Sequence, residues 1–180
     1  MADVDGLLTA VASGSLEGVE SALAAEVSPD AAYGGESIFY PPGTTALVVA
    51  CLNAFKGDSH CHIEKKDIVK ALLRAGANPN PDSGTPPLMY STMNGNASTT
   101  KMLLDAGANA LVTQALGWTP LHRACSRSAA CVELLLASGA DSVVNVQCQN
   151  GTSTKLSRRA AFDDTSSGTS TRSPRPSGRS

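Results

Sequence analysis

The sequence predicts an all-α solenoid of helix-turn-helix repeats with β-turn fingers, followed by a disordered C-terminal tail. A Leu-Leu-x-x-Gly-Ala motif occurs three times, with its glycine at Gly76, Gly107 and Gly139, so the copies lie 31 and 32 residues apart. A Gly-led opening unit precedes each copy. Aromatic residues make up only 4% of the chain, which is typical of close helix contacts rather than large aromatic anchors. A period of this length with two helices per unit indicates a repeat architecture.

Each repeat begins and ends with recognisable helix signals. The opening units are "GTTALVVAC" from Gly43, "GTPPLMYST" from Gly84 and "GWTPLHRAC" from Gly117. Thr followed by Pro is typical of a helix start, with Thr as the N-cap and Pro in the first helical position. Each Leu-Leu pair ends an amphipathic helix, and the glycine after it fits a left-handed C-cap.

The motifs of the fourth repeat carry a family resemblance. "TPLHRAC" at Thr119–Cys125 is close to the Thr-Pro-Leu-His-x-Ala-Ala signature of ankyrin repeats, and "VELLLASGAD" at Val132–Asp141 is close to their second-helix ending. The chain resembles the ankyrin family over residues 5–150. The resemblance implies a stack of helix pairs that bind other proteins through a concave groove.

Several positions depart from the repeat pattern. A weaker N-terminal copy at Leu7–Asp30 has Glu26 where the turn glycine belongs, as expected of a terminal cap. The second repeat has an insertion between its two helices, around Phe55–Lys66. The third repeat has Pro86 at the Thr position, which predicts a weakened cap on its first helix.

These features divide the chain into six segments. We expect an irregular N-terminal capping repeat at 1–32, a repeat with a long preceding loop and an insertion at 33–82, repeats at 83–113 and 114–149, a degenerate partial repeat at 150–162, and a disordered tail at 163–180. The tail is rich in Ser, Thr, Pro, Gly and Arg, so it cannot bury enough apolar surface to become ordered.

The periodicity also predicts the core. We expect the buried apolar residues of the helix pairs to be Leu47, Val69, Leu72, Leu88, Met102, Leu103, Leu121, Val132 and Leu135. Such a stack forms a broad groove lined by turn tips and first helices. It does not form a deep pocket that excludes water.

The resemblance implies which positions face the groove. They are Thr44, Leu52, Asn53, Asp82, Ser83, Thr85, Met93, Asn94, Ala115, Leu116, Trp118, Ser126 and Arg127. We favour Trp118 with Arg127 as the centre of binding, because aromatic and arginine side chains dominate hot spots. The alternative is that Trp118 packs back onto its own repeat. The Tyr33–Tyr40 loop is either a second contact patch or a loop packed on its own groove.

Composition and charge limit the partner classes. A net charge of -2 gives no argument for nucleic acid or a membrane surface. From the predicted groove we expect a protein partner, and we expect the chain to be a monomer. The apolar stretch Thr45–Phe55 is too short to cross a bilayer, and the acidic start does not suggest a secretory signal. Five cysteines, an odd number, favour a reduced intracellular setting, cytoplasmic or nuclear.

No cofactor, bound metal or catalytic residue is expected. His60–His62 is the one metal-like motif, but its adjacent ligands do not readily close a tetrahedral site, and the chain has no Cys-x-x-Cys pair. The resemblance implies a structural role for His122 within its turn. Cys51 and Cys125 occupy helix positions that need a small buried residue, which predicts unreactive thiols.

Two positions are candidates for modification. Ser173 precedes Pro174 and fits a proline-directed kinase site. Asn80 lies in a turn of the kind that asparaginyl hydroxylases modify in the ankyrin family.

Three functions follow from these features. The first is a non-catalytic protein-binding module, acting as a scaffold, an adaptor or a regulatory subunit. The second is the regulatory ankyrin portion of a larger enzyme, such as a kinase or a ubiquitin ligase component. The third is a metal-responsive protein that uses His60–His62.

Overall fold

The computed structural model of the chain describes residues 4–32, 43–52, 61–82, 84–114 and 117–140. This part is helical, and the predicted all-α repeat solenoid is confirmed. Its helices are α1 (Val4–Ser13), α2 (Leu16–Ala24), α3 (Ala46–Leu52), α4 (Cys61–Arg74), α5 (Pro87–Met93), α6 (Ala97–Asp105), α7 (Pro120–Cys125) and α8 (Ala129–Ala137). Extended pairing within these residues is limited to an isolated antiparallel bridge between Ala32 and Thr45.

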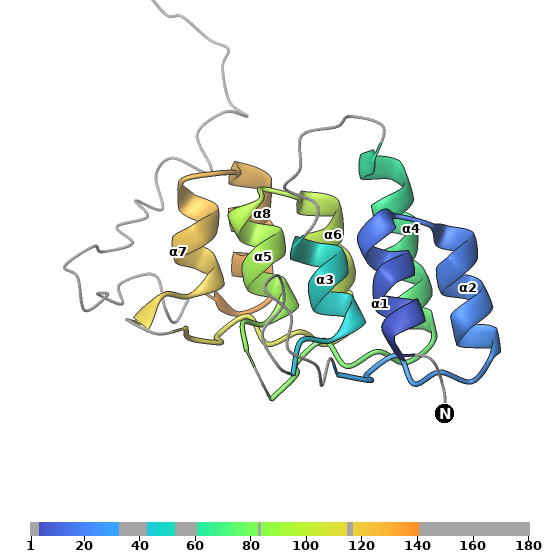
Figure 1. Cartoon of the computed structure of the whole chain (residues 1–180). Coiled ribbons are helices and arrows are strands. Elements are labelled where there is room, and N and C mark those ends of the chain that lie inside the picture. The colour runs from blue at the N-terminus through green and yellow to red at the C-terminus, as the bar shows by residue number, and fades with distance from the viewer. Residues whose placement is uncertain (1–3, 33–42, 53–60, 83, 115–116, 141–180) are drawn as a thin grey trace, which may run out of the picture.

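The helices form two layers. The first helices of the pairs, α1, α3, α5 and α7, lie side by side, and the second helices, α2, α4, α6 and α8, line up behind them (Figure 1). The described parts of the segments that follow α2, α4 and α6 lie below the helices, along the bottom of Figure 1. The main contacts between pairs join each pair to the next one in the row, as in a one-dimensional stack.

The core lies between the two layers. Of the residues predicted to form it, these are buried: Leu47, Val69, Leu72, Leu88, Leu103, Leu121, Val132 and Leu135. Met102 is only partly buried and packs against the edge of this cluster, so the prediction was wrong there. Its neighbour Leu103 takes the central position, because a helix turns by about 100° per residue and only one of the two can point fully inward.

Side-chain caps begin α2, α6, α7 and α8. The hydroxyl of Ser15 accepts a hydrogen bond from the Gly18 amide, and Asn96 and Ser128 cap α6 and α8 in the same way. Thr119 caps α7, and Pro120 occupies its first turn, as predicted. The N-cap of α5 is Pro86, which makes no side-chain cap, so this weakened start is also confirmed.

The turns after the second helices require a left-handed backbone. Gly76, Gly107 and Gly139 have φ angles of 88°, 86° and 89°. Glu26 takes the same place after α2 with φ of 58°, the one non-glycine residue in this region of conformational space within the described part. A side chain in this conformation costs about 1–2 kcal/mol, a cost that the three glycines avoid.

The predicted insertion is partly helical. We expected Phe55–Lys66 to form an insertion between the two helices of the second repeat, but α4 already begins at Cys61 and runs for 14 residues. Residues 61–66 contain neither Pro nor Gly and include Glu and Lys, which are good helix formers, so the helix extends backwards through them. The Tyr33–Tyr40 loop, the partial repeat at 150–162 and the predicted tail lie outside the described residues.

Candidate functional site on the first-helix face

The turn before α7 positions Trp118. The Gln114 amide donates to the carbonyl oxygen of Trp118 at 2.8 Å, and the Gly117 amide donates to the carbonyl of Gln114 at 3.1 Å. Gly117 has a φ angle of 77°, a backbone conformation that would be strained for a residue with a side chain. Thr119 then begins α7, so the indole is attached directly to the first turn of a helix.

The Trp118 side chain lies in an aromatic and cationic cluster on its own repeat. Its ring meets the His122 ring edge-on, with centroids 5.8 Å apart and planes at 67°. The guanidinium carbon of Arg123 lies 4.5 Å from the centroid of the indole, a cation–π contact. Trp118 is half-buried, so part of the indole remains accessible to another molecule.

His122 has the structural role that the resemblance implied within its turn. Its Nδ1 lies 2.8 Å from the Thr119 hydroxyl oxygen and accepts a hydrogen bond from the Thr119 amide at 3.3 Å. Both residues are buried. Because these contacts complete a capping box, His122 fixes the start of α7 and the platform on which Trp118 rests.

A series of side-chain hydrogen bonds connects this cluster to the preceding repeat. Gln114 Nε2 donates to the Thr85 hydroxyl at 2.6 Å, and Arg123 Nη2 donates to Gln114 Oε1 at 3.5 Å. Sequence reasoning missed Arg123. A signal was available, because side chains on a helix lean toward its N-terminus, and Arg123 follows Trp118 by about one turn.

The structure separates the two residues that we favoured as a centre. Trp118 precedes the N-cap of α7, whereas Arg127 follows its C-cap, Ser126. The six residues of α7 span about 9 Å, so Trp118 and Arg127 lie near opposite ends of this helix. Arg127 is exposed and lies beside Gly95 of the preceding repeat. Arg123 lies between the two ends.

The other predicted groove residues differ in accessibility. Thr44 is buried, whereas Asp82 and Ser126 are exposed. The half-buried ones are Leu52, Thr85, Met93 and Asn94. Asn94 Nδ2 also donates to the carbonyl of Cys51 at 3.0 Å, which connects the end of α5 to the end of α3. Those outside the described residues are Asn53, Ser83, Ala115 and Leu116.

Asn80 connects neighbouring turns. Its Oδ1 accepts a hydrogen bond from the Asn109 amide at 2.7 Å, and its Nδ2 donates to the carbonyl of Gly107 at 2.9 Å. Asp30 has an equivalent role one repeat earlier, where it accepts from the Asn78 amide at 2.6 Å. The carboxamide of Asn80 is exposed, but both of its ends hold the next turn in place. Ser173 lies outside the described residues.

The cysteines predicted to be buried differ from each other. Cys51 is fully buried, and this burial raises the pKa of its thiol to about 12, so it remains protonated and unreactive at neutral pH. Cys125 is exposed, so its predicted burial was wrong. It is the last residue of α7, in the final helix pair that the structure describes, whereas α5 packs beside the helix that carries Cys51.

The described residues show no metal-binding cluster of three or more His, Cys, Asp or Glu side chains. Within the His60–His62 motif, His60 lies outside the described residues, and the side chains of Cys61 and His62 are likewise not described. In the same part of the chain, no helix has both the length and the apolar character of a membrane span.

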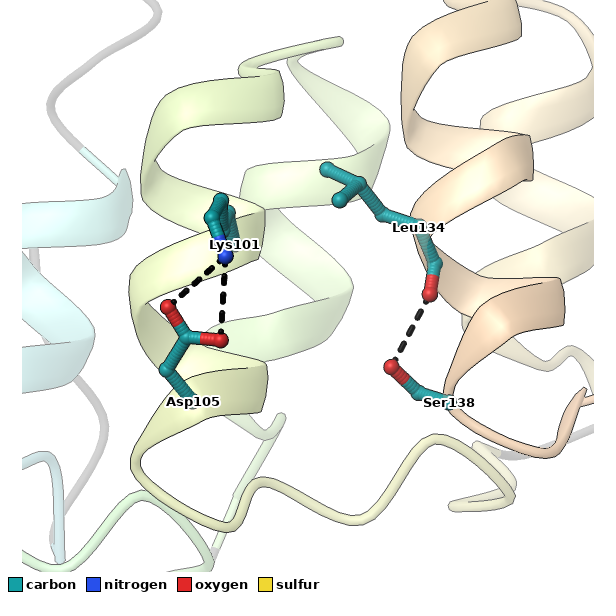
Figure 2. A network of polar contacts seen from close by, with 4 residues as sticks. All are labelled: Lys101, Asp105, Leu134 and Ser138. Carbon is teal, nitrogen blue, oxygen red and sulfur yellow. Dashed lines mark hydrogen bonds and ion pairs between the residues drawn. The ribbon is translucent and has the colours of Figure 1, made fainter.

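The second-helix face differs from this cluster. A shallow groove of about 480 Å³ runs between α6 and α8, lined by Ala97, Ser98, Lys101, Ala130, Glu133, Leu134 and Ala137. Figure 2 shows the Leu134 side chain pointing from α8 toward α6, while Lys101 pairs with Asp105 on its own helix at 3.1 Å. The hydroxyl of Ser138, the C-cap of α8, donates to the Leu134 carbonyl of the same helix at 2.9 Å (Figure 2).

Comparison with known proteins agrees with this architecture. Residues 59–146 match the family described as ankyrin repeats, in three copies. A stretch of 92 residues is 38% identical to the E3 ubiquitin-protein ligase KEG of Arabidopsis thaliana. This match covers 49% of the chain but only 6% of that protein, so the chain spans a small fraction of this relative's length.

Proposed function

Because the chain belongs to the ankyrin-repeat family, we propose that it is a non-catalytic module that binds a protein partner through the concave face of its first helices and turn tips. Ankyrin repeats are protein-interaction modules without catalytic activity of their own. The cluster at the start of α7 carries this proposal. A half-buried Trp118 with a guanidinium over its ring is the kind of ordered aromatic and arginine anchor that dominates binding hot spots.

The proposed contact surface contains the accessible groove residues together with Arg123. Its members are Leu52, Asp82, Thr85, Met93, Asn94, Trp118, Arg123, Ser126 and Arg127. Trp118 and Arg127 mark its two ends along α7, so a partner that spans this helix would touch both. The role of the module, as a scaffold, an adaptor or a regulatory subunit, depends on what is bound.

Affinity purification with mass spectrometry tests this proposal, with the wild-type chain as bait. Replacing both Trp118 and Arg127 by Ala should abolish capture of the partner while leaving the helical circular dichroism unchanged. The matched control replaces Lys101 and Glu133, which line the groove on the second-helix face, and should retain capture. Equal capture by the wild type and the Trp118/Arg127 variant would count against this surface.

A second function is the regulatory ankyrin portion of a larger enzyme, such as a ubiquitin ligase component or a kinase. The similarity to a protein named as an E3 ubiquitin ligase favours the ligase version. An antibody raised against residues 84–140 would report the size of the native protein in its source cells. A species much larger than 18.4 kDa with peptides of a catalytic domain would support this function, and a native species of 18.4 kDa would contradict it.

The repeat division and the two modifications also remain proposals. The division places one repeat in each of the segments 1–32, 33–82, 83–113 and 114–149. Mass spectrometry of the native protein would show whether Asn80 is hydroxylated or Ser173 is phosphorylated. Because both ends of the Asn80 carboxamide bond the next turn, an enzyme must displace those hydrogen bonds to reach it.

A further inference from the structure

We propose that Arg123 receives a carboxylate from the partner, so that the protein segment recognised at the start of α7 is acidic. This inference rests on the proposed function and names the chemistry of the partner. It concerns the guanidinium that lies 4.5 Å from the centroid of the Trp118 ring.

Arg123 has no acidic partner among the described residues. The ion pair found in that part of the chain joins Lys101 to Asp105 on the opposite layer. The Arg123 Nη2 group reaches only the neutral oxygen of Gln114, at 3.5 Å, and its Nε is buried without an acceptor there. A guanidinium carries five N–H donors in a planar fork that matches the two oxygens of a carboxylate.

The guanidinium is also held in position before any partner binds. The indole lies against it, and Gln114 is itself fixed by a 2.6 Å hydrogen bond from its Nε2 to the Thr85 hydroxyl. A side chain ordered in advance loses less conformational entropy on binding. The accessible part of Trp118 offers apolar surface beside the charge, which suits an acidic residue with an apolar neighbour.

The distribution of charge along the first helices favours an acidic ligand at this end. The helices α3 and α5 contain no charged residue, and Asp5 belongs to α1 at the opposite end of the row (Figure 1). Arg123 and Arg127 thus give the α7 end of the contact surface a positive charge, while the carboxylate of that surface, Asp82, lies in the turn before α5. A positive charge steers negative groups toward it. A nucleic acid is disfavoured, because the chain as a whole carries a net charge of -2.

Selection from a library of short random peptides displayed on phage tests the inference. The wild-type chain should enrich peptides that share an Asp or Glu at one position. An enriched peptide is then synthesised, and its affinity is measured through the emission of Trp118, the single tryptophan of the chain. Replacing its acidic residue by the amide, or Arg123 by Gln, should each weaken binding about tenfold, and the two together should add little.

Two further variants keep the test independent of folding defects. Gln114→Glu places a carboxylate on the chain itself beside Arg123 Nη2, so it should compete with the acidic peptide and lower its affinity about tenfold. Arg123→Lys keeps the charge but loses the planar fork, so it should fall between the wild type and Arg123→Gln. Lys101→Gln on the second-helix face is the matched control and should leave the affinity unchanged.

The possible failures are distinguishable. Peptides that bind the first-helix face without an acidic residue, or that bind Arg123→Gln as tightly as the wild type, would overturn the inference and leave the proposed function standing. Tight binding of single-stranded DNA that depends on Arg123 would also overturn it. If no peptide or captured protein binds this face, the proposed function fails together with the inference.

Discussion

The first-helix face and the second-helix face of the stack differ in where their side chains bond. On the first-helix face, Gln114 bonds Thr85 and Asn94 bonds the Cys51 carbonyl, so side chains join one repeat to the next. On the second-helix face, the exposed Lys101–Asp105 pair remains within one helix, and the contact between the Thr100 hydroxyl of α6 and Cys131 Sγ of α8, at 3.6 Å, is buried beneath the surface. Bonds between repeats fix the relative positions of groups that a partner must touch together, so the first-helix face is the better prepared binding surface.

The largest expected effect comes from the core that both faces share. Leu135 is fully buried, so Leu135→Ala should lower the free energy of unfolding by about 2–5 kcal/mol. Leu134, next to it, is half-buried at the groove of the second-helix face, so Leu134→Ala should cost about 1 kcal/mol or less. Urea denaturation measures both, and equal losses would contradict the assignment of Leu135 to the core.

The next effect compares the loss of stability when the N-cap of α7 is removed with the loss when the N-cap of α8 is removed. Thr119→Ala should cost about 1–2 kcal/mol, because it removes the cap and also the hydroxyl that contacts the buried His122 Nδ1. Ser128 caps α8 by accepting a single hydrogen bond from the Cys131 amide, so Ser128→Ala should cost about 1 kcal/mol or less. A smaller loss for Thr119→Ala than for Ser128→Ala in thermal unfolding would contradict this reading.

A smaller effect tests the bond that crosses between repeats. Gln114→Ala removes the hydrogen bond to Thr85 and the contact with Arg123, which should cost about 0.5–1.5 kcal/mol. Because Arg123 then loses a positioning partner, the emission of Trp118 should change as well. An unchanged emission spectrum would show that Gln114 does not order the cluster.

The smallest effect is expected on the second-helix face. The Lys101 and Asp105 side chains are 62% and 63% exposed, so their ion pair is screened by water. Lys101→Ala should therefore change the free energy of unfolding by about 0.5 kcal/mol or less and leave partner binding intact. A loss above about 1 kcal/mol in urea denaturation, or weaker binding, would break the contrast between the two faces.

Local rules predicted much of the fold. Gly107 marked a left-handed turn, Thr119 with Pro120 marked the start of a helix, and Leu135 marked the core, because each depends on its near neighbours in sequence. The exposure of Cys125 could not be predicted in this way. It depends on what packs beside α7, which the repeat pattern alone does not show.

The candidate site was predicted less completely than the fold. The tip position of Trp118 followed from the motif, but the cation over its ring did not. Arg123 had the appearance of a solvated helix residue, and its contacts arise from the turn at Gln114 and from Thr85 of the preceding repeat. Contacts that join segments about thirty residues apart follow from the stacking of the repeats, which is a tertiary property.

Hydrogen exchange of the chain in complex with its captured partner tests the central claim most directly. We predict slower amide exchange over residues 114–127, which hold the turn tip and α7, with little change over α6 and α8. Protection confined to the groove between α6 and α8, with residues 114–127 exchanging as in the free chain, would contradict binding through the first-helix face.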